Sequence, residues 1–89
     1  MTIDPRLLGT WTRIHYDDDG GLEISVTFEE DGSLIWTMEA DGRKEEIAMP
    51  YTIEGDAILS QQRSRYRFDG EILVVIFNDE EFRYTRRFE

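Results

Sequence analysis

The sequence predicts an all-β domain of about eight short antiparallel strands in up-and-down order, closed into a small barrel. Apolar and polar residues alternate with a period of two along most of the 89 residues, which is typical of half-buried strands. Gly beside acidic residues interrupts this alternation at short intervals, as in a series of hairpins. Closure would leave no exposed strand edge. The alternative is an open or half-closed sheet that completes its core by dimerising.

The first half of the chain contains four expected strands, over residues 10–16, 22–29, 34–40 and 45–54. A single helical turn over residues 4–8 precedes them at most, because no segment of about ten residues has apolar positions at helical spacing. The turns between the strands contain Gly and Asp, which accept the positive φ of tight hairpins. Pro50 has no amide hydrogen, so the sequence predicts a bulge or an edge position there.

The second half contains four further expected strands, over residues 57–62, 63–69, 71–78 and 81–88. The third of these is apolar at every position from 72 to 77, as in a strand that is covered on both faces. We therefore expect its outward side chains to form an interface through which the protein self-associates. These side chains are Leu73, Val75 and Phe77, or Ile72, Val74 and Ile76 if the register is reversed.

Length and charge limit the classes of function. One domain spans residues 1–89, and the chain has no cysteine and therefore no disulfide framework. Twenty acidic residues against ten basic ones give a net charge of −10, which argues against binding to nucleic acid or to an anionic membrane. No apolar stretch approaches the roughly 18 residues of a membrane span, and the start of the chain has no signal-peptide pattern. We expect a cytoplasmic protein.

Three segments resemble the lipocalin-like (calycin-type) small domains of bacteria. They are residues 7–11 (Leu-Leu-Gly-Thr-Trp), residues 26–33 (Val-Thr-Phe-Glu-Glu-Asp-Gly-Ser) and residues 51–56 (Tyr-Thr-Ile-Glu-Gly-Asp). The resemblance implies that Trp11 closes the barrel floor and that a basic residue near the end of the last strand packs over its ring. Arg86 fits this role because it shares a face with Phe82 and Tyr84. A guanidinium stacked on an indole gains roughly 0.5–2 kcal/mol.

Polar candidates for chemistry are few. His15 is the single histidine and lies beside the acidic residues 17–19, so it could act as a general base, but neither a second histidine nor a placed nucleophile accompanies it. The acidic clusters at residues 17–19 and 29–31 lack the ligand spacing of a calcium loop. We expect no metal, no cofactor and no enzymatic activity.

Two further groups of side chains are candidate binding surfaces. Arg63, Arg65 and Arg67 alternate along one expected strand, and they either form a stripe for an anion or a partner or pair with neighbouring acids. Large side chains that point inward line a pocket or fill the core, and we expect them to fill the core. This second group is Trp36, Met38, Met49, Tyr51, Tyr66, Phe68 and Tyr84.

The sequence thus favours a non-enzymatic module for protein interaction or binding. The expected occupants are a second copy of the chain, a protein partner or a small apolar ligand. The alternative function is a binder of small hydrophobic ligands of the lipocalin type, which would need an empty interior.

Overall fold

The computed structural model describes residues 4–17, 20–40 and 42–87, without the side chains of Tyr16 and Asp17. Parts of the expected turns, of the acidic cluster over residues 17–19 and of the last expected strand lie outside the described residues. The positions concerned are residues 18, 19, 41 and 88. The elements are η1 (Pro5–Leu7), β1 (Gly9–Asp17), β2 (Gly20–Phe28), β3 (Ser33–Ala40), β4 (Arg43–Pro50), β5 (Thr52–Glu54), β6 (Ala57–Leu59), β7 (Arg63–Asp69), β8 (Ile72–Phe77) and β9 (Glu80–Arg86). The all-β prediction is confirmed.

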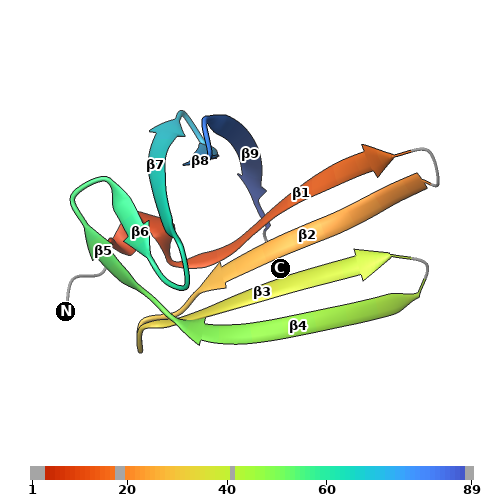
Figure 1. Ribbon diagram of the computed structural model, residues 1–89, viewed down its shortest axis with the longest axis horizontal. Coiled ribbons are helices and arrows are strands. Elements are labelled where there is room, and N and C mark those ends of the chain that lie inside the picture. Colours follow the sequence, from red (N-terminus) through yellow and green to blue (C-terminus); the bar gives the residue numbers. More distant parts are fainter. Residues whose placement is uncertain (1–3, 18–19, 41, 88–89) are drawn as a thin grey trace.

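All strands belong to one antiparallel sheet in the order β4-β3-β2-β1-β9-β8-β7-β6-β5. Consecutive strands pair with each other except β4 and β5, and β1 pairs with β9, which brings the two ends of the chain together (Figure 1). This pairing, Trp11 to Arg86 and Thr12 to Thr85, curls the sheet into a nearly closed barrel. β4 and β5 are the two edges. The architecture is compatible with the expected lipocalin-like one.

The structure has nine strands rather than about eight because the expected strand over residues 45–54 is divided after Pro50. β4 pairs only with β3, and β5 pairs only with β6. Between them, the Tyr51 amide donates to the carbonyl of Gly32. Proline therefore ends an edge strand, the position in which its missing amide hydrogen costs least.

A two-residue turn joins β8 to β9, since Phe77 pairs with Glu80. Its residues Asn78 and Asp79 have φ of 52° and 64°. Positive φ at both central residues is the type I′ geometry, whose twist matches that of the flanking strands. Asn and Asp accept this left-handed region more readily than other residues with a Cβ.

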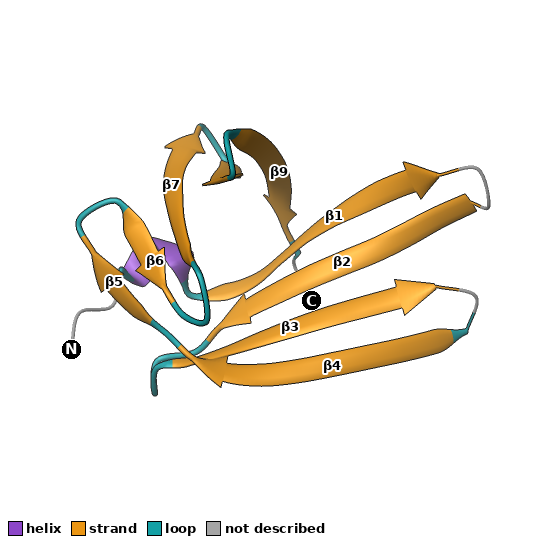
Figure 2. Ribbon diagram, in the orientation of Figure 1, coloured by secondary structure: helices purple, strands orange, loops and turns teal. Residues whose placement is uncertain are grey.

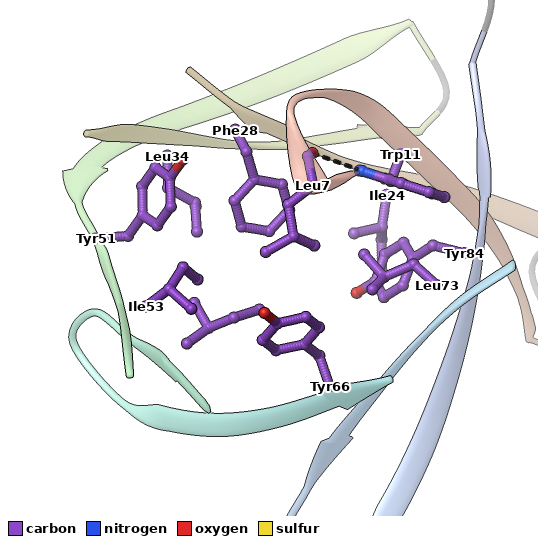
Figure 3. Close-up of a cluster of buried hydrophobic side chains, with 11 residues drawn as sticks. Leu7, Trp11, Ile24, Phe28, Leu34, Tyr51, Ile53, Tyr66, Leu73 and Tyr84 are labelled. Atoms are coloured by element: carbon purple, nitrogen blue, oxygen red, sulfur yellow. Dashed lines mark hydrogen bonds between the residues drawn. The ribbon is translucent and has the colours of Figure 1, made fainter. Parts of the chain in front are cut away.

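The core lies at the end of the barrel that η1 covers (Figures 2 and 3). Leu7 from η1 is buried there among side chains of β1, β2, β5, β7 and β8. The strands β1 to β4 have eight or nine residues each, whereas β5 to β9 have three to seven. The long strands consequently project beyond the short ones at the other end (Figure 1). In the described ranges, no helix has the length and apolar composition needed to span a bilayer.

A candidate binding groove above a sealed floor

Trp11 and Arg86 pack against each other at the floor of the barrel. The Trp11 side chain is 2% exposed, and its Nε1 donates to the carbonyl of Leu7 at 2.9 Å. The Arg86 guanidinium carbon lies 4.2 Å from the centre of the Trp11 ring. Its Nη1 and Nη2 donate to the carbonyls of Leu8 and Arg6 at 2.6 and 2.7 Å. The structure thus brings together the two residues that the sequence singled out for closure.

Gly9 makes room for this contact. Its φ is +112°, and a Cβ at this position would lie 2.7 Å from Nη1 of Arg86. Both the backbone conformation and the close approach require glycine here. The Gly9-x-Trp11 motif therefore has a physical basis in this chain: glycine admits the guanidinium, and tryptophan supplies the ring under it.

The tyrosines expected to line a pocket are mostly part of the core. Tyr51 and Tyr66 are buried, and their hydroxyls donate to the carbonyl of Glu29 at 3.1 Å and to Oδ2 of Asp4 at 2.8 Å. Burial, with the hydrogen bond to Asp4, raises the pKa of Tyr66 to about 12. Burial also raises the pKa of Tyr51. These two hydroxyls are occupied by the fold, so they do not orient a ligand.

A groove of about 440 Å³ lies between the β3–β4 hairpin, the segment that joins β6 to β7, and the ends of β8 and β9 next to their shared turn. Its apolar walls include Trp36 of β3, Ile47 and Met49 of β4, Phe77 of β8 and Phe82 of β9. Ile47 is 46% exposed. The groove also contains Tyr84 and the polar residues Ser60, Gln61 and Gln62. Met38 lies farther out, in a hollow with Leu22, Ala40, Arg43 and Glu45.

The expectation of a filled interior is therefore wrong at this end. The large side chains do point inward, as the alternation predicts, but Trp36 and Met49 are only partly buried. The reason is the open edge of the sheet. β4 is an edge strand that pairs with β3 on one side only, so no further strand among the described residues covers the inward side chains of Ile47 and Met49.

Arg13 is the charged residue of the groove. It lies on β1 two residues after Trp11, on the same inward face. Its guanidinium carbon is 4.7 Å from the Phe82 ring centre and 5.7 Å from that of Tyr84. Its Nε is buried and has no hydrogen-bond partner among the described residues. The sequence analysis missed this residue, although its parity with Trp11 was the available signal.

Comparison with known protein families, curated proteins and solved structures finds no match to this chain.

Of the two registers considered for the outward face of β8, the structure has the reversed one. Leu73 is 1% exposed and belongs to the core, Val75 packs against that core, and Phe77 lines the groove. The outward side chains are those of the reversed register, Ile72, Val74 and Ile76. Because this strand is apolar on both faces, alternation could not determine which face is buried.

The outer face of β8 is covered within the chain at its centre. Val74 is 0% exposed and pairs with Arg67 of β7 on one side and Arg83 of β9 on the other. Arg67 forms an ion pair with Glu81 at 3.3 Å, and Arg83 forms one with Asp69 at 3.3 Å. The stems of the two arginines cover the apolar row while their charged ends stay in water.

The expected arginine stripe on β7 is exposed and largely paired. Arg65 donates to Oδ2 of Asp56 at 2.8 Å, which lowers the pKa of that carboxyl. Arg67 contacts Glu81, and Arg63 is exposed. The pairing interpretation therefore accounts for two of the three arginines, and each such surface pair contributes only about 0–1 kcal/mol.

His15 is exposed near the projecting end of β1. Within the part of the chain that the structure describes, no three His, Cys, Asp or Glu side chains gather as a metal site would require. The chemistry available at the groove is that of Arg13 and of apolar contact.

Proposed function

We propose that this protein is a non-enzymatic binding module that takes a small apolar ligand into the groove. The observation that carries the proposal is that three large aromatic side chains, those of Trp36, Phe77 and Phe82, line the groove and are partly exposed. Ligand pockets are concave, mostly apolar and roughly 300–1,000 Å³ in volume, and the groove of about 440 Å³ falls in this range. The non-enzymatic part of the proposal rests on the sequence, which has one histidine and no cysteine.

A lipocalin-like relationship belongs to the same proposal. The floor contact between Trp11 and Arg86 and the open opposite end support it. The length of the chain, 89 residues, accounts for a shallow groove in place of a deep cavity, since short strands enclose less space. Localisation in the cytoplasm stays a prediction.

Binding of a protein partner is the second candidate function, and β4 supports it. This strand is a sheet edge that borders the groove with Ile47 and Met49, and an extended peptide can add to such an edge. Its first four residues are all charged and Pro50 ends it, however, and both features oppose strand addition. The small ligand is therefore the favoured occupant.

Titration with the neutral dye N-phenyl-1-naphthylamine tests the proposal. We expect saturable one-to-one binding with enhanced dye fluorescence. Ile47→Asp places a charge on the groove wall and should weaken binding by about tenfold or more. Ile14→Asp is the matched control, because Ile14 is an equally bulky, 55% exposed residue on the outward side of β1. Equal effects of the two variants, or no saturable binding, would reject the groove as a ligand site.

A further inference from the structure

The groove differs in charge from the rest of the molecule. The chain has 20 acidic residues and a net charge of −10. Among the described residues that line the groove, none is acidic, and Arg13 is the only charged one. The described lining of the groove is therefore positively charged, whereas the chain as a whole is strongly acidic.

The guanidinium of Arg13 lies against two aromatic rings, with its carbon 4.7 Å from the centre of the Phe82 ring and 5.7 Å from that of Tyr84. Such contacts attract the cation but accept none of its N–H groups. Its Nε is buried with no acceptor within the described residues. No protein carboxylate lines the groove beside this cation within the described residues.

We propose that the groove selects a small amphipathic carboxylate. This inference rests on the proposed ligand-binding function and adds the chemical class of the ligand. The carboxylate pairs with Arg13, and the apolar body lies against Trp36, Ile47 and Phe77. Arginine is suited to this role because its planar set of donors matches the two oxygens of a carboxylate. The aromatic contacts fix the guanidinium before the ligand binds, which reduces the entropy lost on binding.

Displacement of the neutral dye by three ligands of equal chain length tests the selectivity. The ligands are octanoate, octanol and octyltrimethylammonium, so that only the head group changes. We expect octanoate to bind about tenfold or more tightly than octanol, as for a charge-assisted hydrogen bond in a water-poor site. The cationic ligand should bind most weakly, because it would meet Arg13.

Arg13→Gln should abolish the preference for octanoate over octanol, since it removes the one charge among the described residues of the groove. Arg63→Gln removes the same charge from an exposed site on β7 and should leave the preference intact. A second measurement does not depend on folding of the variant. In the wild-type protein, the Nε–H resonance of Arg13 should shift on addition of octanoate and not on addition of octanol.

The outcomes separate the two proposals. If octanoate and octanol bind equally, or if Arg13→Gln keeps the preference, the carboxylate inference is wrong while the apolar groove stands. If the Arg13 resonance does not respond to octanoate that is bound, the inference is likewise wrong. If neither the dye nor any of the three ligands binds, both proposals fail.

Discussion

The guanidinium of Arg86, on the last strand, stacks on the ring of Trp11. It also donates hydrogen bonds to the carbonyls of Arg6 and Leu8, in the N-terminal segment. This one side chain therefore joins η1, β1 and β9. Among the described residues, the β1–β9 ladder consists of two residue pairs. Closure of the barrel thus depends on side chains at the floor as much as on backbone pairing.

Removal of either floor residue should destabilise the fold. Trp11→Ala should lower the free energy of unfolding by about 3–5 kcal/mol, as for other buried aromatics. Arg86→Met keeps the stem but loses the stacking and the hydrogen bonds, and we expect a loss of about 2–4 kcal/mol. Urea denaturation followed by tryptophan fluorescence or circular dichroism measures both.

Arg87→Met is the matched control for the arginine substitution. Arg87 is the next residue along the chain, is exposed, and forms a surface ion pair with Glu23 at 3.5 Å. Its replacement should change stability by less than about 1 kcal/mol. Equal losses in the two arginine variants would show that the floor contact has no special role.

Gly9→Ala tests the close approach directly. Strain at a positive φ together with the clash at 2.7 Å should lower the free energy of unfolding by about 1–3 kcal/mol. In the Arg86→Met background the clash is absent, so the same substitution should cost less. This non-additivity, measured as a double-mutant cycle, is expected only for residues in contact. Strict additivity would contradict the contact.

Alternation and turn chemistry predicted most of the fold. The strands around Ile24, Phe28 and Leu34 have the inward face that period-two alternation requires, and these three residues are buried. The floor contact followed from parity together with the resemblance around Gly9 and Trp11. These features are local, so the sequence carries a direct signal for each of them.

The groove could not be predicted because its walls come from strands that are distant in sequence. Trp36 has the same alternation signal as Leu34, yet Leu34 is buried while Trp36 is only partly buried. Parity with Trp11 places Arg13 on the inward face of β1, but its contact with Phe82 of β9 has no local signal in the sequence. The burial of these residues is decided by strands distant in sequence, which no local pattern reports.

Burial of Tyr66, together with its hydrogen bond to Asp4, should make stability depend on pH at the alkaline end. The pKa of Tyr66 is raised to about 12 in the folded state, against about 10 in the unfolded chain. A raised folded pKa means that this contribution is complete below pH about 10 and is lost as the pH rises through about 12. Tyr66→Phe should lower stability at pH 7 by about 1 kcal/mol.

Denaturation of the wild type and Tyr66→Phe between pH 8 and 12 provides the measurement. The difference in free energy of unfolding between the two should be constant near pH 8 and should shrink above pH 10. The acid end gives a second check. Hydrogen bonds from Arg6, and then from Tyr66, keep the pKa of Asp4 below its usual range, so their stabilisation is lost as the pH falls through that lowered pKa. A wild-type advantage that does not vary with pH would reject the coupling.

Coverage of the outer face of β8 should limit self-association. Arg67 and Arg83 flank the fully buried Val74 and form ion pairs with Glu81 and Asp69 across it. Arg67→Ala combined with Arg83→Ala removes these stems and exposes the apolar row of Ile72, Val74 and Ile76. Exposed apolar patches of this kind drive association, so the double variant should have a higher average mass than the wild type in light scattering at micromolar concentration.

The control for this experiment is Arg43→Ala combined with Arg63→Ala. It removes the same number of charges from exposed sites on β4 and β7, so both double variants have a net charge of −12 against −10 for the wild type. Arg43 pairs with Ala40 and Arg63 pairs with Leu59, and neither pairs with the apolar row of β8, so the control should associate no more than the wild type. If both double variants associate equally, charge alone is responsible. If neither double variant associates, the exposed side chains of Ile72, Val74 and Ile76 do not mediate self-association. A homodimer would then have to form through a different face of the barrel.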